Sequence, residues 1–167
     1  MAHRITEIMN TVEESRPPRK TNKSKGFGLI IHITDNLDPA FTKTAAEYDC
    51  VKKAAVVKHD LLADDDEYKT LLEYIRSNPG AYVSVDLKAR LWLPDQVNKG
   101  LRQGGKLPAD LEQRRARELV LLDRIIAVCS ACLNTGGEIS FAMPAASSAW
   151  LRDEVLSFTV ANKLIGV

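Results

Sequence analysis

Apolar and polar positions along the chain alternate between two patterns, one typical of buried strands and one typical of amphipathic helices. The strand pattern occurs in four short apolar runs, at residues 26–34, 53–60 and 81–87 and between Gly137 and Pro144. The helical spacing of apolar residues occurs at residues 38–48, 68–77, 111–134 and 148–156. This order predicts an α/β fold, in which a mainly parallel, Rossmann-like sheet carries helices on both faces.

Residue types at the segment ends support these assignments. Asp38 and Pro39 suit the N-cap and the first position of a helix, and the acidic run 64–67 suits a helix start. Gly136 and Gly137 are expected to end the longest helix. One face of that helix is apolar, through Leu119, Leu122, Ile126, Cys129 and Leu133. Residues 157–167 fit either a continued helix or a strand.

Composition suggests one folded unit with a tail. Residues 1–25 are polar and contain Pro17 and Pro18 among charges, so we expect a flexible basic arm followed by a single α/β domain over residues 26–167. A long loop rich in glycine and proline, residues 88–108, follows the third strand. Loops of this length are usually functional or disordered.

The formal net charge of +1 argues against a general polyanion binder, but it conceals local excesses. Residues 1–25 contain six basic and three acidic groups, and residues 88–117 contain eight basic and three acidic groups. Such excesses steer an anionic partner if they share a face, and otherwise they are solvated segments.

The location expected from the sequence is intracellular, cytoplasmic or nuclear, without a membrane partner. No apolar run approaches the roughly 20 residues that span a bilayer, and the amino terminus lacks a secretory signal. The odd number of cysteines, three, suits a reducing compartment. Cys129 and Cys132 form a CxxC in the middle of a helix, which indicates two core cysteines and predicts no metal site. A homo-oligomer is compatible with the sequence.

Three aspartates fall at or near predicted strand ends: Asp35, Asp60 and Asp86. In a parallel sheet they would line one edge, where carboxylates bind ribose, hold a metal or move a proton. Alternatively, they cap the turns that follow. His32 and His59 are close enough in sequence to join a polar cluster there, although a structural histidine is the more common case.

Basic residues form the best candidate for phosphate contact. They are Lys99, Arg102, Lys106, Arg114, Arg115 and Arg117. The alternative is a solvated helix face paired with Glu112 and Glu118. Trp92 and Trp150 fit either base stacking or the core. Because no glycine follows the first strand, we expect no ordinary dinucleotide site and no cofactor.

The order of these features over residues 60–158 resembles DNA-methyltransferase-like domains found in mobile-element and viral polyproteins. The elements that carry the resemblance are His59-Asp60, the helix 68–77, the strand 82–87, the loop 88–108, Gly136-Gly137, Pro144, Ser148 and Trp150. In that group, a proline–cysteine turn follows the strand, and an acidic residue stands two positions before the later proline. The resemblance implies that Met143, Pro144, Ser148 and Trp150 form a pocket wall.

Two departures change what the resemblance implies about activity. Residues 85–90 contain neither proline nor cysteine, and Ala142 and Met143 stand before Pro144 where the acid is expected. Cytosine methylation needs a thiolate nucleophile and a carboxylate near the flipped base. The expected function is therefore a pseudoenzyme that binds nucleic acid or a protein partner as an assembly module. The alternative is an active enzyme that uses Asp35, Asp60 and Asp86 in metal-assisted phosphoryl transfer or as a nuclease.

Overall fold

The chain folds around a four-stranded parallel sheet, which confirms the α/β prediction. The computed structural model describes residues 4–5, 28–35, 39–47, 51, 53–96 and 109–164. The strands are β1 (Leu29–Thr34), β2 (Lys53–Lys58), β3 (Tyr82–Asp86) and β4 (Glu138–Ala142). They lie in the order β2-β1-β3-β4, and each neighbouring pair is parallel.

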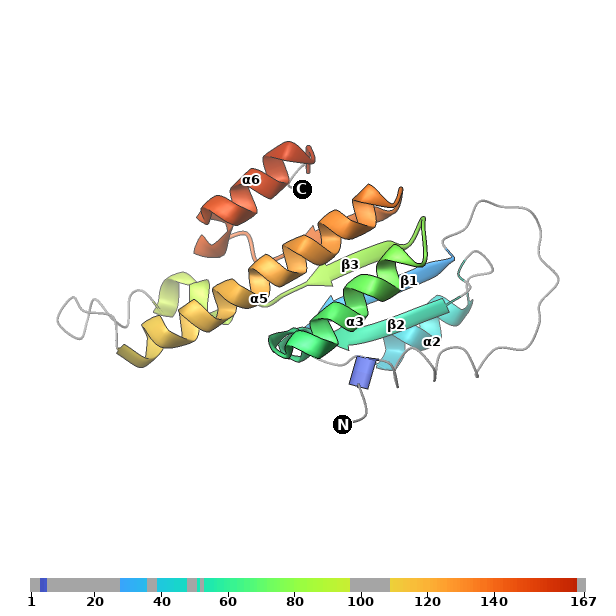
Figure 1. The fold of residues 1–167 in the computed structure, drawn as a ribbon. Coiled ribbons are helices and arrows are strands. Elements are labelled where there is room, and N and C mark those ends of the chain that lie inside the picture. The colour runs from blue at the N-terminus through green and yellow to red at the C-terminus, as the bar shows by residue number, and fades with distance from the viewer. Residues whose placement is uncertain are drawn as a thin grey trace.

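Helices cover both faces of this sheet, as expected (Figure 1). One face carries α2 (Pro39–Glu47), which packs on β2. The other face carries α3 (Asp65–Arg76) and α5 (Ala109–Asn134), which also contact each other. After β4, the 3₁₀ helix η3 (Ser148–Leu151) leads into α6 (Asp153–Ala161), which packs on α5.

Alternation along the strands divides the buried side chains between two cores. Ile31 and Ile33 of β1 are fully buried in the larger core, together with Val83 and Val85 of β3. Ile30, on the other side of β1, packs against a smaller cluster that includes Ala45 of α2. Because β1 has apolar side chains on both faces, Ile30 on one and Ile31 and Ile33 on the other, it reads in the sequence as a nearly continuous hydrophobic run.

α5 is much longer than the sheet on which it lies. Its 26 residues rise about 39 Å, whereas strands of five or six residues extend about 20 Å. The helix runs back from the carboxyl edge of the sheet to the start of β4, so its first turns project beyond that edge (Figure 1). This projection places part of the basic segment above the ends of β1 and β3.

Two predicted boundaries were wrong. The second strand ends at Lys58, and His59–Ala63 form a 3₁₀ helix, η1, where the strand was expected to reach Asp60. The last helix starts later than Ser148 and continues to Ala161, which resolves the ambiguous segment as helical up to that point. Val155 and Phe158 are buried, so packing decides where α6 lies.

The helix start predicted at residues 64–67 and the two core cysteines are confirmed, whereas Asp38, the expected N-cap of the helix that begins at Pro39, lies outside the described residues. The Asp64 side chain accepts hydrogen bonds from the N–H groups of Asp66 and Glu67 and thereby caps α3. Cys129 and Cys132 are buried, and burial raises the pKa of both thiols. In the described part of the chain, no helix combines the length and the hydropathy that crossing a membrane requires.

The amino-terminal residues Arg4 and Ile5 lie against the domain. Ile5 is fully buried in the larger core. The buried carboxylate of Glu67, in the first turn of α3, accepts hydrogen bonds from the N–H groups of Arg4 and Ile5, at 2.8 Å for Ile5. The rest of the expected basic arm, residues 1–25, lies outside the described residues.

Gly137 provides a test of the tight junction between α5 and β4. A Cβ at this position would overlap Ala81 O and Cys132 Sγ. We expect Gly137→Ala to lower the free energy of unfolding by about 1–3 kcal/mol, measured by denaturant titration. Gly28→Ala is the matched control, because no atom of the described residues lies within 4 Å of the added methyl group. Equal stability of the two variants would contradict the close packing.

Candidate functional site

The sheet topology itself marks a position for a ligand. The chain leaves β1 for β2 on one side and returns to β3 on the other, so the connecting helices diverge between the carboxyl ends of β1 and β3. Ligands of open α/β sheets bind in the crevice at such a point. A cavity of about 450 Å³ lies there, which we name the carboxyl-edge cavity.

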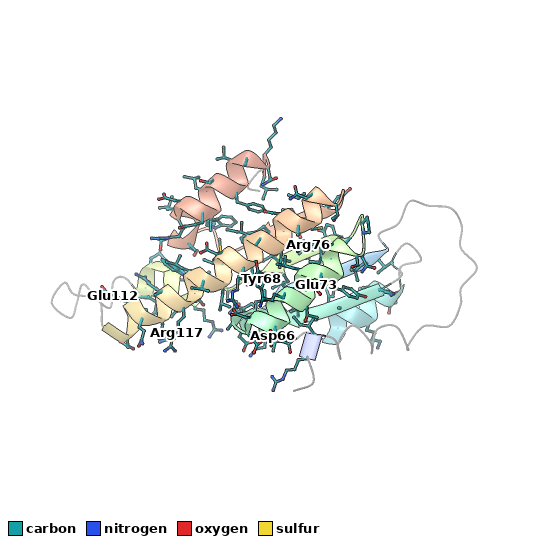
Figure 2. All side chains as sticks on the ribbon, viewed as in Figure 1. Asp66, Tyr68, Glu73, Arg76, Glu112 and Arg117 are labelled. Carbon is teal, nitrogen blue, oxygen red and sulfur yellow. The ribbon has the colours of Figure 1, made fainter. Side chains whose placement is uncertain are left out.

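Charged side chains dominate the lining of this cavity. Its residues are Asp35, His59, Lys88, Arg90, Leu91, Arg114, Arg117 and Glu118. Four are basic and two are acidic, and all four basic residues are exposed. Two of the basic residues follow β3 and two come from the projecting turns of α5. Figure 2 labels Arg117 on this part of α5.

Asp35 and His59 meet at the floor of the cavity. Asp35 follows β1, and its Oδ2 accepts a hydrogen bond of 2.6 Å from the backbone N–H of Lys88. Its Oδ1 lies 3.2 Å from His59 Nδ1. That nitrogen is buried and makes no hydrogen bond to any described residue, so its contact with Asp35 is one of close distance. Of the polar cluster considered for His32, His59, Asp35 and Asp60, the structure brings together Asp35 and His59.

Glu118 is the second carboxylate of the cavity. Trp92 Nε1 donates a 3.0 Å hydrogen bond to Glu118 Oε2. Burial raises the pKa of Glu118 above its ordinary value, while the hydrogen bond from Trp92 and the charge of His59 act in the opposite direction. Asp35, His59 and Glu118 also line a smaller, mostly apolar pocket behind the cavity, next to Trp92.

Trp92 is the structural support of this region. It belongs to η2 (Arg90–Trp92) and is buried, as expected for a core tryptophan. The guanidinium groups of Arg115 and Arg152 lie 5.0 Å and 5.8 Å from its ring centre, within the range of cation–π attraction. Arg115 also donates two hydrogen bonds, of 2.9 and 2.8 Å, to Leu91 O.

Arg124 of α5 positions the segment that carries His59. It donates hydrogen bonds to the carbonyl oxygens of Leu62 and Ala63 in η1, at 2.6 and 3.0 Å, and pairs with Asp65. Its guanidinium lies 5.0 Å from the ring centre of Tyr68. Figure 2 shows Tyr68 between α3 and α5. The turn after β2 is therefore attached to the same helix that supplies Glu118.

The three aspartates do not converge. Asp35 lines the cavity, but Asp60 lies on η1 and forms an exposed ion pair of 2.6 Å with Lys58. Asp86 is exposed at the end of β3, opposite Ala142, and does not line the cavity. His32 lies elsewhere, where its ring stacks on Phe41 and its Nδ1 is 3.2 Å from Ser84 Oγ.

The predicted basic set is divided. Arg114 and Arg117 line the cavity, whereas Arg115 is bound to Leu91 and Trp92. Lys99, Arg102 and Lys106 lie outside the described residues. The structure adds Lys88, Arg90 and Glu118 to the site. The basic excess of residues 88–117 indicates Lys88 and Arg90. From the sequence, Glu118 is expected only as a partner of the basic residues on a solvated helix face.

The residues expected to form a pocket wall pack behind the cavity and do not line it. Met143 is buried in the larger core. Ser148 Oγ donates a 3.0 Å hydrogen bond to Trp92 O, and Trp150 Nε1 donates one of 3.0 Å to Pro144 O. Of these residues, Ser148 is connected to the site, through its hydrogen bond to Trp92.

Comparison with known proteins gives no relative from which a role could be transferred. No protein-family model, no curated protein and no solved structure matches this chain. Within the described residues, no group of three or more His, Cys, Asp or Glu side chains is arranged to hold a metal ion. The resemblance to DNA-methyltransferase-like domains stays a prediction.

The Glu118 carboxylate has a measurable consequence for stability. Its pKa is raised in the folded state, so its contribution to stability is greatest at acidic pH and is lost as pH rises through the folded-state pKa. Glu118→Gln removes this titration and keeps an acceptor for Trp92. We expect the variant to gain stability relative to the parent protein as pH rises from about 3 to 7.

Urea unfolding at several pH values measures this difference. Glu73→Gln, on the exposed face of α3, removes a carboxylate away from the cavity and serves as the control (Figure 2). A loss of relative stability with rising pH in Glu118→Gln would contradict the burial of the charge.

Proposed function

We propose that this domain is a binding module for phosphate-bearing ligands, nucleic acid foremost, and that the ligand binds at the carboxyl-edge cavity. The observation that carries this proposal is the convergence of four basic side chains on one cavity at the switch point of the sheet. They are Lys88, Arg90, Arg114 and Arg117.

Two physical arguments support an anionic ligand. Charges of one sign around a concave surface focus the electrostatic potential and raise the local concentration of the opposite charge. Arginine also offers planar pairs of donors that match phosphate oxygens. The basic excess of residues 88–117 thus contributes to one site through two pairs of residues, 88/90 and 114/117, and the two pairs are at least 24 positions apart in the chain.

The proposal does not include methyl transfer. The turn after β3 lacks the proline and cysteine of a cytosine methyltransferase, and Ala142 and Met143 replace the acidic segment. If the domain shares ancestry with that group, it retains the scaffold and a nucleic-acid surface. The alternative of three cooperating aspartates gains no support from the contacts, since Asp60 pairs with Lys58 and Asp86 is exposed away from Asp35's cavity.

The proposal predicts a specific change in salt dependence. Each lost phosphate contact lowers the slope of log affinity against log salt by about 0.7–0.9. We therefore expect Arg114→Ala combined with Arg117→Ala to reduce the slope for a fluorescent single-stranded oligonucleotide by about 1.5. Fluorescence anisotropy at several salt concentrations measures it.

Arg76→Ala is the matched control, because Arg76 is an exposed arginine at the carboxyl-terminal end of α3 (Figure 2). It should leave the slope nearly unchanged. Arg115 is excluded from the test, since its contacts with Leu91 and Trp92 would mix stability with binding. An unchanged slope in the double variant, or no binding by the parent protein, would overturn the proposal.

A further inference from the structure

The carboxyl-edge cavity keeps its opposite charges apart. Among the described residues, neither Asp35 nor Glu118 forms an ion pair within 4.0 Å with Lys88, Arg90, Arg114 or Arg117. Instead, the backbone N–H of Lys88 donates a hydrogen bond to Asp35, and the indole N–H of Trp92 donates one to Glu118. His59 Nδ1 lies 3.2 Å from Asp35 Oδ1. The site therefore presents a cationic rim and a carboxylate floor that are not in direct contact. Burial raises the pKa of Glu118, and the charge of Arg114 acts on it in the opposite direction.

A carboxylate floor is unfavourable for a ligand that is only anionic. A phosphate group that entered deeply would contact Asp35 and Glu118. Inorganic phosphate is therefore attracted by the basic residues of the rim and repelled by the carboxylates of the floor. A ligand that carries hydrogen-bond donors some distance from its phosphate meets both surfaces favourably. Carboxylates accept such hydrogen bonds with up to four lone pairs each.

Glu118 is the better placed of the two acceptors. Its Oε2 is held by Trp92, while Oε1 has no hydrogen-bond partner in the part of the chain that the structure describes. Trp92 is itself buried and contacts the guanidinium groups of Arg115 and Arg152, so the donor that holds the carboxylate is fixed by its own packing. Such an arrangement limits the entropy that Glu118 loses when it binds a donor.

From these observations we infer that the carboxyl-edge cavity binds one nucleotide, with its phosphate on the cationic rim and its hydrogen-bond donors on Glu118 and Asp35. This inference rests on the proposed function and names the ligand of the same site. The cavity volume of about 450 Å³ is within the range of small-ligand sites. The donors of a nucleotide are the ribose hydroxyls or an amino group of the base.

Isothermal titration with four probes tests the inference: adenosine monophosphate, ribose 5-phosphate, dideoxyadenosine monophosphate and inorganic phosphate. We expect adenosine monophosphate to bind at least about tenfold more tightly than inorganic phosphate, as hydrogen bonds to a charged acceptor predict. If ribose 5-phosphate keeps that advantage, the hydroxyls are the donors. If dideoxyadenosine monophosphate keeps it, the base amino group is the donor.

Glu118→Gln should remove most of the advantage, about tenfold, while leaving the affinity for inorganic phosphate unchanged or higher. Asp35→Asn is the second variant, should the first fold poorly, and Glu73→Gln is the matched control outside the cavity. Thermal unfolding of each variant verifies the fold.

The results distinguish a failure of this inference from a failure of the proposed function. If oligonucleotides bind with the expected salt dependence, but adenosine monophosphate binds no better than inorganic phosphate, the inference fails and the proposed function stands. An advantage of adenosine monophosphate that survives both Glu118→Gln and Asp35→Asn likewise overturns it. If neither oligonucleotide nor nucleotide binds, both fail.

Discussion

The difference in length between α5 and the sheet is the constraint on which the rest of the structure depends. A helix of 26 residues must bury its apolar face on strands of five or six residues, and only part of it can do so. Leu122, Ile125 and Cys129 are buried in the larger core, which places the turn with Arg114 and Arg117 beyond the carboxyl edge. The cavity wall is therefore a consequence of where the helix finds its hydrophobic contacts.

Trp92 connects this projecting part of α5 to the sheet. Its indole N–H, ring and carbonyl oxygen interact with Glu118, with Arg115 and Arg152, and with Ser148. It joins three segments far apart in sequence, namely the turn after β3, α5 and the region between β4 and α6. A single buried side chain thus provides apolar packing on one side and orients a polar group of the cavity on the other.

Local patterns in the sequence predicted the strands, the helices and the parallel sheet. Each of these depends on how apolar residues are spaced within a short segment of the chain. The same patterns placed Asp35 and the end of the second strand at one edge of the sheet, because parallel strands end together, but they did not single out the contact between Asp35 and His59. They failed for Asp60, because η1 replaces the last residues of the expected strand. Glu118 could not be identified either, because its role depends on a hydrogen bond from Trp92, 26 positions earlier.

The contact between Ile5 and the core changes what counts as the folding unit. Composition places a boundary at residue 26, but Glu67 is a buried carboxylate whose charge is compensated by two backbone donors, from Arg4 and Ile5. A protein shortened to residues 26–167 would keep every strand yet leave that carboxylate without these donors and leave empty the space that Ile5 fills. Arg4 and Ile5 therefore belong to the packed structure of the domain, although they precede the boundary that residue composition suggests.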